Sequence, residues 1–393
     1  MAIISNLTLE NFRNFHKKNL EFNSNLILLT GNNGIGKTSI IEAMAIIGRG
    51  SNKIRGASYD EMINHQIKDQ DEIINQQYSS GQYFSIIANI KNHQYFDDIA
   101  IRFTAHNKQK QLFCNRQEVS KQKMSEYRNY LINFIFLTPQ LEQIFILGKS
   151  QRREYLDQIV LDIEYMHSER LNNYQKLLKE RLKILDKANR KNSNIEEYLN
   201  WLKIIENKIV EIAIVIAFSR VEAIKLFNQA INDFDSKFPK SRLEIIGDIE
   251  EKIINNENLV SIEDFYHQKL IDNRIIDLQS NKTNFGIHRS DFMAIFCDKN
   301  MAADRASTGE QKAIMIGITL ARAKISSLYK NLPTILLFDE IFSHLDEQRK
   351  ICLIDEIIAT NLQTFFTATS SDMLPAIYQQ FQILFLTNTI SNP

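Results

Sequence analysis

Residues Gly31 to Thr38 read GNNGIGKT and follow the apolar run from Asn25 to Thr30. The stretch satisfies the GxxxxGK[ST] pattern between an expected strand and an expected helix, which is the arrangement that phosphate binding requires. Glycines let backbone amides wrap phosphates, the lysine reaches the β and γ oxygens, and the threonine ligates magnesium. A flexible turn is the alternative. We expect an ATP and Mg2+ site with these nucleotide-binding residues: Gly31, Asn32, Asn33, Gly34, Ile35, Gly36, Lys37 and Thr38.

A second motif, ILLFDE at Ile335 to Glu340, is an apolar strand that ends in two adjacent carboxylates. Open α/β sheets place their ligands at the carboxyl ends of strands. Because phosphoryl transfer needs mainly positioning and charge neutralisation, we expect Asp339 to hold magnesium and Glu340 to orient the attacking water. With Lys37 they form the expected catalytic set. An exposed acidic strand end is the alternative for this motif taken alone.

The distance along the chain between these motifs is unusual. About three hundred residues separate Lys37 from Asp339, whereas a compact phosphate-loop domain keeps both within one domain-sized stretch. The sequence therefore predicts a large insertion between the two halves of the nucleotide site.

Two further motifs flank the carboxylate strand. RASTGEQKA, Arg305 to Ala313, resembles the ABC signature, which in that superfamily closes over the γ-phosphate held by another subunit, so Ser307 and Gly309 are expected to act in trans. A helix N-cap with Glu310 in the first turn is a compatible alternative. FSHLDE, Phe342 to Glu347, resembles a D-loop with Asp346 as its acidic residue, and an ordinary polar turn is the alternative.

Two positions bear on metal and nucleotide sensing. Gln140, in FLTPQLEQI, is a candidate Q-loop residue that contacts the metal, although a lone glutamine after a proline carries little information. After QTFFTAT, many ABC ATPases carry a switch histidine, but here Ala368 and Thr369 occupy that region. A histidine-based switch is therefore not expected.

The hydrophobic pattern predicts an α/β fold with a mixed sheet and an inserted helical lobe. The order of the phosphate loop, the signature-like turn and the carboxylate strand resembles that of an ABC-type phosphate-loop ATPase head. A polar break at Asn189 to Asn194 divides the helical part, from Gln151 to about Phe234, into a short hairpin. Trp201 is expected on an apolar helix face with Ile205 and Ile209. The expected domains are an N-terminal ATPase lobe, a helical lobe and a C-terminal ATPase lobe, at residues 1–148, 149–282 and 283–393.

Composition limits the partners. The 47 basic and 47 acidic residues give a formal net charge of zero, so any affinity for nucleic acid must come from a local basic face. Three scattered cysteines suggest neither a disulfide framework nor a zinc site. The N-terminus lacks a signal-peptide pattern and no stretch is long and apolar enough to span a membrane. We expect a cytoplasmic protein without a membrane partner.

The chain resembles the RecF family of bacterial SMC-like ATPases over nearly its whole length. LTLENFRNF at Leu7 to Phe15, the phosphate loop, GKSQRREYLDQ at Gly148 to Gln158 and FGIHRSDF with RASTGEQKA carry the resemblance. The family usually has GPHRDD where this chain has GIHRSD at Gly286 to Asp291. Arg13 resembles an arginine near the nucleotide in SMC-like heads, and an interlobe salt bridge is the alternative.

The resemblance implies ATP-driven homodimerisation with two nucleotides between the subunits and slow, DNA-stimulated hydrolysis. It also implies binding to single- and double-stranded DNA at gap junctions, RecR and RecO as partners in loading RecA, and a part in the SOS response.

A basic helical segment offers a candidate DNA surface, because clustered cations track phosphates through counterion release. A solvated helix face with spaced ion pairs is the alternative. The candidate DNA-binding residues are Lys176, Lys179, Arg181, Lys183, Lys187, Arg190 and Lys191.

Three other functions remain open at this point. Another SMC-like ATPase, of the defence or overcoming-lysogenization type, would need extra carboxylates that form a metal site. The nucleotide-binding subunit of a transporter would lack the helical hairpin. A DNA clamp that holds ATP only as a structural ligand would not need Glu340.

Overall fold

The computed structural model describes residues 3–49, 58–64, 83–92, 95–106, 108–120, 122–123, 133–190, 195–233, 236–330 and 334–387. Backbone contacts divide the chain into two compact units. The first, here called the terminal unit, combines Met1–Glu142 with Ser326–Pro393, and the second, the inserted unit, is Gln143–Ile325. The predicted insertion between the two halves of the nucleotide site is therefore present as a unit of its own.

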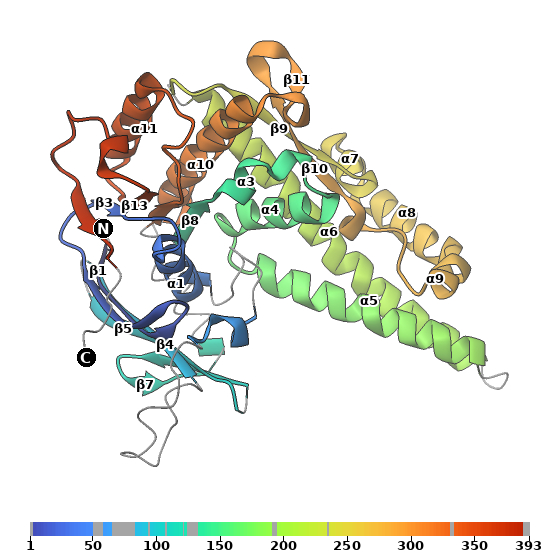
Figure 1. The fold of residues 1–393 in the computed structure, drawn as a ribbon. Coiled ribbons are helices and arrows are strands. Elements are labelled where there is room, and N and C mark those ends of the chain that lie inside the picture. Colours follow the sequence, from blue (N-terminus) through green and yellow to red (C-terminus); the bar gives the residue numbers. More distant parts are fainter. Residues whose placement is uncertain are drawn as a thin grey trace. The chain divides into compact units, whose positions relative to one another are not determined.

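A parallel sheet of the terminal unit collects strands from both ends of the chain (Figure 1). Its strands in spatial order are β14 (Gln382–Phe385), β3 (Leu26–Thr30), β13 (Gln363–Ala368), β12 (Thr334–Phe338) and β8 (Asn133–Leu137). Strands β3, β12 and β13 are buried at every position, which explains the apolar runs in β3 and β12, whereas β13 also buries Gln363, Thr364 and Thr367. Because all neighbours are parallel, their carboxyl ends meet at one edge.

An antiparallel sheet forms the other layer of the terminal unit. Its spatial order is β2 (Phe15–Glu21), β1 (Ile3–Phe12), β4 (Tyr83–Asn92), β5 (Tyr95–Thr104), β6 (Gln109–Cys114) and β7 (Gln117–Glu118). In β1 the side chains of Leu7 and Leu9 are buried and Thr8 and Glu10 are less so. This alternation is the pattern expected of a sheet with one face on the core.

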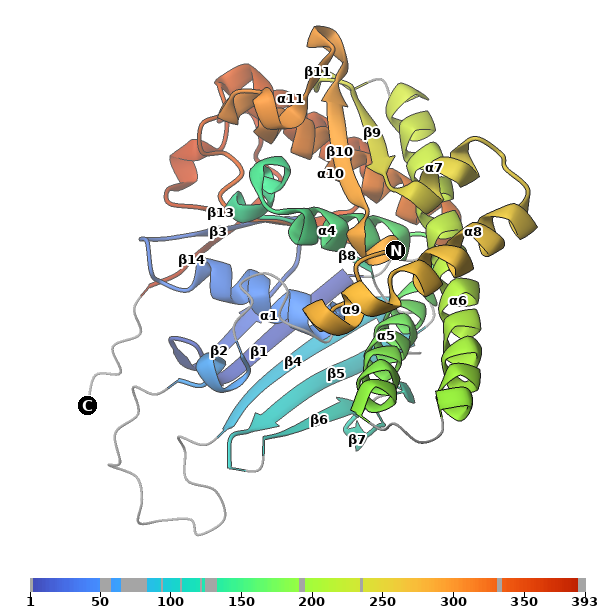
Figure 2. The ribbon, with the colours of Figure 1, turned by 90° about the vertical axis from the view of Figure 1, so that its right-hand side faces the viewer.

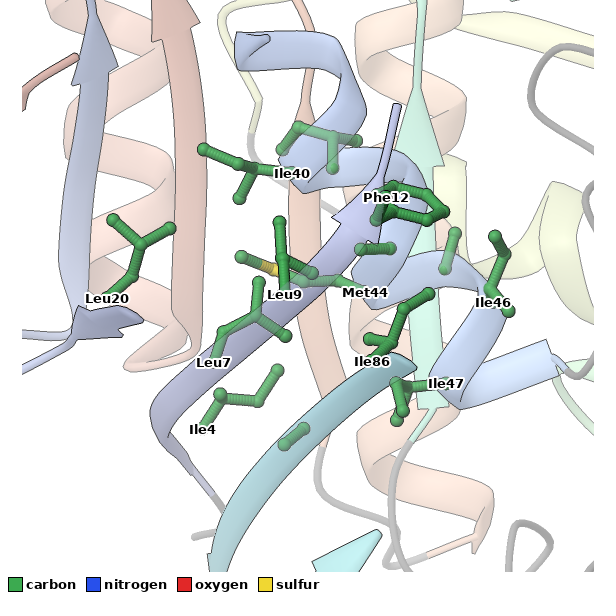
Figure 3. Packing of buried hydrophobic residues seen from close by; sticks show 14 of the residues in the cluster. Ile4, Leu7, Leu9, Phe12, Leu20, Ile40, Met44, Ile46, Ile47 and Ile86 are labelled. Carbon is green, nitrogen blue, oxygen red and sulfur yellow. The ribbon is translucent and has the colours of Figure 1, made fainter. Parts of the chain in front are cut away.

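Helix α1 (Lys37–Arg49) lies between these two sheets (Figure 2). Its residues Ile40, Met44 and Ile47 pack against Leu7 and Leu9 of β1 in one hydrophobic cluster (Figure 3). All residues from Ser39 to Ile47 are buried, as expected of a helix that is covered on every side. This packing fixes the start of α1, and with it the position of the phosphate loop.

The inserted unit is mainly helical. A hairpin of α5 (His167–Arg190) and α6 (Ile195–Asp233) dominates it (Figure 1). Of the predicted break at Asn189 to Asn194, the first two residues belong to α5 and residues 191–194 lie outside the described part. The helical stretch also breaks between α4 (Lys149–Leu161) and α5, which the sequence did not indicate. A small antiparallel sheet has the order β11 (Met301–Ala302), β10 (Asp291–Phe296), β9 (Ser241–Ile246).

The shorter elements complete the two units. The helices are α3 (Pro139–Glu142), α7 (Asp248–Ile254), α8 (Leu259–Asp272), α9 (Arg274–Ser280), α10 (Thr308–Lys330) and α11 (Glu347–Thr360). The 3-10 turns are η1 (Asp60–Met62), η2 (Ile144–Ile146), η3 (Ile287–Arg289), η4 (Cys297–Lys299), η5 (Ala303–Arg305) and η6 (Ser371–Met373). None of the helices in the described ranges is both long enough and apolar enough to span a bilayer.

The contact division differs from the expected domains at two places. Residues 143–148 group with the inserted unit and not with the N-terminal ATPase lobe, and residues 283–325 group with it and not with a C-terminal ATPase lobe. For residues 283–325 the reason is packing: β10 pairs with β9 over its whole length, from Asp291 opposite Ile246 to Phe296 opposite Ser241.

Candidate functional site

The phosphate loop joins β3 to α1 through glycines with positive φ angles. Gly34 and Gly36 have φ angles of +81° and +109°, which side chains with a Cβ rarely adopt. A Cβ on Gly36 would also lie 2.4 Å from the ring of Phe15. Glycine is thus required for the loop to lie against β2 and present its backbone amides at the start of α1.

Lys37 is a buried cation held by neutral groups. Its Nζ donates to the carbonyl oxygens of Gly31 at 2.6 Å and Asn32 at 3.0 Å, and the residue is 5% exposed. Burial lowers the pKa of Lys37, and the nearby charges of Glu340 and Asp339 oppose that shift. An anion in the loop would stabilise the charged form further, so the surroundings of Lys37 suit a phosphate ligand.

The two expected magnesium ligands contact each other. The hydroxyl of Thr38 donates to Oδ1 of Asp339 at 3.1 Å, although the two residues are 301 positions apart. The hydroxyl of Thr367, in β13, donates to the same Oδ1 at 2.7 Å. A carboxylate with a neighbouring hydroxyl is an oxygen donor set that Mg2+ prefers.

Glu340 follows Asp339 with its backbone in the left-handed region, at φ +52°. Its N–H donates to the Thr367 hydroxyl at 2.8 Å, so one hydroxyl holds both residues after the strand. A non-glycine residue at positive φ is strained and is kept only where surrounding contacts fix it. Thr367 was not predicted from the sequence. The only indication of its role was its position in TFFTAT, one residue before the expected switch region.

Lys37, Thr38 and Glu340 line one cavity of about 510 Å3. Seven of its lining residues belong to the predicted set, from Arg13 near one end of the chain to Glu340 near the other, whereas Asn14 and Asn64 were not predicted. Asn14 donates to the carbonyl of Gly34 at 3.2 Å and so links the β1–β2 turn to the loop. The full lining is Arg13, Asn14, Asn33, Gly34, Gly36, Lys37, Thr38, Ser39, Glu61, Ile63, Asn64 and Glu340.

Arg13 lines this cavity, but its guanidinium is occupied. Nε and Nη2 donate to the carboxylate of Glu42 on α1 at 2.9 and 2.7 Å, and Nη1 donates to the Glu61 carbonyl at 2.9 Å. Both partners belong to the terminal unit, so the interlobe salt bridge considered as an alternative is wrong. Arg13 holds the cavity wall together, and nucleotide contact by this residue stays a prediction.

The signature forms the start of α10. Ser307 and Glu310 make a reciprocal capping box: the Ser307 N–H and hydroxyl donate to the Glu310 carboxylate at 2.9 and 2.8 Å. The hydrogen bond from Lys299 and those from Ser307 lower the pKa of Glu310 to about 2. A Cβ on Gly309 would meet nothing within 4 Å. The space beside Gly309 is therefore open, whereas the Glu310 carboxylate caps the Ser307 N–H.

Asp346 of the D-loop motif caps α11, because its side chain accepts from the N–H of Arg349 at 2.8 Å. Gln140 is exposed on α3 and is not among the residues that line the cavity. The structure therefore does not bring the candidate metal-sensing glutamine to the expected magnesium ligands.

A family model described as the RecF/RecN/SMC N-terminal domain matches residues 3–392. The DNA replication and repair protein RecF of Rickettsia typhi is 34% identical over 384 residues, which are 97% of this chain and 98% of that protein. The chain belongs to the RecF family. Membership also places it among the ABC-type ATPases, and the predicted RecF resemblance is confirmed.

Two solved structures share the fold. A structure of the recombination mediator RecF with ATP, from the RecFOR pathway, has a TM-score of 0.78 at 22% identity and covers 95% of both chains. An Smc head bound to the C-winged helix domain of ScpA has a TM-score of 0.51 at 15% identity, over 94% of this chain and 90% of that one. The predicted α/β head of the ABC/SMC type is confirmed.

The loop that departs from the RecF pattern, GIHRSD, has a structural part in the inserted unit. His288 bridges the Thr283 carbonyl and the Tyr174 hydroxyl, each at 2.8 Å, and burial lowers the pKa of His288. Asp291 accepts two hydrogen bonds from Arg152 at 2.7 Å each. These contacts join the loop to α4 within the inserted unit.

The predicted DNA surface of this RecF-family chain needs one correction. Arg181 is fully buried and binds Glu206 and Asp277 at 2.9 and 2.6 Å, so its prediction as a DNA contact is wrong. Two carboxylates from α6 and α9 neutralise it, which the charge pattern of one helix cannot reveal. Lys191 lies outside the described residues, as does the side chain of Arg190. Exposed members of the set are Lys176, Lys179, Lys183 and Lys187.

Proposed function

We propose that this protein is an ATP-dependent DNA-binding ATPase of replication and recombinational repair. One observation carries the proposal: Lys37, Thr38 and Glu340, predicted separately from two distant motifs, line one cavity, and Thr38 hydrogen-bonds to Asp339 beside Glu340. A 34% identical relative that is named a DNA replication and repair protein supports the process.

The residues have separate roles in this proposal. The amides at the start of α1 and the Lys37 ammonium bind the phosphates of ATP, because the loop lines the cavity and Lys37 is hydrogen-bonded to uncharged carbonyl oxygens. Thr38 and Asp339 hold the magnesium ion, which neutralises charge on the phosphates when bound. Glu340 orients the attacking water. Arg13 supports the wall through Glu42, and Gln140 reaches the metal only if α3 moves.

The signature acts across a homodimer in this proposal. Ser307 and Gly309 at the N-terminus of α10 contact the γ-phosphate held by a second subunit, because Gly309 leaves space beside the backbone there, and the phosphate replaces the Glu310 carboxylate that caps Ser307. Asp346 supports that interface from its cap on α11. ATP binding then assembles the dimer, and slow hydrolysis, stimulated by DNA, releases it.

The wider assignments rest on RecF-family membership. We propose single- and double-stranded DNA at gap junctions as the substrate, RecR and RecO as partners in loading RecA, a part in the SOS response, and the cytoplasm as the site of action. Residues 1–148 and 283–393 act together on the nucleotide, and residues 149–282 extend to other partners.

The molecular mass of Glu340→Gln in solution tests the proposal. We expect ATP and magnesium to shift this variant from monomer to dimer, because only the water-orienting step is lost, and we expect gapped DNA to strengthen the shift. The matched control carries Ser307→Arg in the same background and should bind ATP but remain monomeric.

Other outcomes separate the alternatives. A Glu340→Gln protein that stays monomeric at saturating ATP contradicts the shared-nucleotide dimer. A dimer indifferent to DNA favours another SMC-like ATPase. Full repair function in the Glu340→Gln variant favours a clamp that holds ATP without needing hydrolysis, and co-purification with membranes favours a transporter subunit.

A further inference from the structure

Helix α5 has two faces of opposite character. Its inner face buries Tyr174, Arg181 and Leu185 within the inserted unit. Its outer face carries an exposed row of lysines, which we call the lysine stripe: Lys176, Lys179, Lys183 and Lys187. Steps of three or four residues place successive members about 4.5 to 6 Å apart along the helix axis. The cations therefore repeat at nearly regular intervals along one line.

A groove lies beside the end of this stripe, between α5 and α6. Its volume is about 350 Å3, and we call it the Trp201 groove. The lining residues are Glu180, Lys183, Ile184, Lys187, Trp201, Ile204 and Ile205. Two lysines and one glutamate leave the lining with a net charge of one positive.

Trp201 was expected on the buried apolar face with Ile209, but the structure leaves it 55% exposed, like Ile204. Ile209 is fully buried, so the predicted apolar face of α6 is covered at Ile209 but not at Trp201. An exposed aromatic ring within reach of a cationic row is the arrangement with which proteins bind single-stranded nucleic acid, since the ring stacks a base and the cations contact phosphates.

We propose that the Trp201 groove and the lysine stripe bind single-stranded DNA, with one base stacked on Trp201 and phosphates on Lys183 and Lys187. The stripe continues beyond the groove to Lys179 and Lys176, and this repetition matches a regular polyanion better than a local acidic patch on a protein. The inference rests on the proposed DNA binding and names the surface that performs it.

The chain offers a site-specific probe, because Trp201 is its one tryptophan. Tryptophan fluorescence of the full-length protein should fall when oligothymidylate is added, and the binding should weaken with salt. The Trp201→Ala variant should bind a labelled oligothymidylate about 5- to 150-fold more weakly, whereas Trp201→Phe should retain most of the affinity.

Charge variants test the stripe. The Lys183→Gln/Lys187→Gln protein should lose affinity, and the slope of log affinity against log salt should fall by roughly 0.7 for each charge that contacts a phosphate. The control is Lys225→Gln, an exposed lysine elsewhere on α6 whose pairing with Glu222 already occupies it at 2.9 Å. That variant should bind like the original protein.

Specific results overturn the inference. Fluorescence that is unchanged at saturating oligonucleotide, or equal affinity in Trp201→Ala, removes the stacking contact. Quenching by polyglutamate without quenching by oligonucleotide assigns the groove to an acidic protein partner. ATP-driven dimerisation of Trp201→Ala should be normal. If the unmodified protein does not dimerise with ATP, that result contradicts the proposed function, whereas the fluorescence and affinity measurements still test the groove.

Discussion

Lys37 and Arg181 are both buried cations on helices, but their surroundings differ. Lys37 donates to two carbonyl oxygens, which carry no formal charge, and it lies at a cavity. Arg181 donates to two carboxylates and to the Leu270 carbonyl at 2.6 Å. A buried charge is costly unless it is neutralised. The cation held by neutral groups therefore suits an external anion, whereas the cation held by carboxylates stabilises the fold.

Replacing Arg181 should have the largest effect on stability. Arg181→Met removes the guanidinium that binds buried Asp277 and leaves Glu206 with its hydrogen bonds from Arg274. Removing one member of a buried pair costs about 3–5 kcal/mol. Denaturant unfolding followed by circular dichroism measures the loss. The control is Lys183→Met on the exposed face of the same helix, which should change stability by less than about 0.5 kcal/mol. Weaker DNA binding at unchanged stability would show that Arg181 is a DNA contact after all.

Replacing Lys37 should reduce ATP turnover without reducing the stability of the fold. Lys37→Ala should reduce ATP turnover about 10²- to 10³-fold, because a charged donor to the phosphates is lost. The stability of the nucleotide-free protein should not fall, since a desolvated cation has been removed. ATP should no longer raise the melting temperature of the variant. A variant as unstable as Arg181→Met would contradict the distinction between the two cations.

Asp157 extends the comparison to pH. Burial alone would raise its pKa, but Arg220 and His167 lower the pKa of Asp157 from 3.8 to about 2. The folded pKa is depressed, so the stabilisation is present above pH 3.8 and is lost as the pH falls towards 2, a loss of about 2 kcal/mol. Urea unfolding of Asp157→Asn should show a flatter acid limb. An unchanged acid limb would mean that the pairing of Arg220 with the Asp157 carboxylate does not contribute to the stability.

Thr367 provides the smallest expected effect. Thr367→Val keeps the shape but removes the hydroxyl that binds Asp339 and the Glu340 N–H, and loss of such an outer contact lowers metal affinity or activity about tenfold. The readout is the magnesium concentration needed for half-maximal turnover. Thr367→Ser should restore it, and Thr364→Val, a buried threonine at the other end of β13, should leave it unchanged. Equal magnesium dependence in all three variants would remove Thr367 from the site.

The nucleotide site was predictable because its information is local. Each motif combines an apolar strand with the residues that follow it, so the phosphate loop and the Asp339–Glu340 pair could be placed without knowing the fold. Their meeting followed from the rule that ligands bind at the carboxyl ends of parallel strands.

Long-range contacts were not predictable. The partner of Arg181 at Asp277 is 96 residues away, so the basic segment read as a uniform surface. Thr367 also lay outside any motif, because its role depends on the alignment of β13 with β12. Trp201 fitted the helical apolar period, but the period cannot tell where a face ceases to be covered.

The parallel sheet has a consequence for biosynthesis. Gln363 at the start of β13 exchanges two hydrogen bonds, of 2.8 and 2.9 Å, with the backbone of Ile4, 359 residues earlier. At the usual rate of translation, roughly 5–20 residues per second, about 20 to 70 s pass between the synthesis of Ile4 and the synthesis of Gln363. The inserted unit is complete before then. Nascent chains that end before residue 334 contain the phosphate loop but neither Asp339 nor Glu340. The hydrolytic site therefore forms only after β12 and β13 have been synthesised and have joined the sheet.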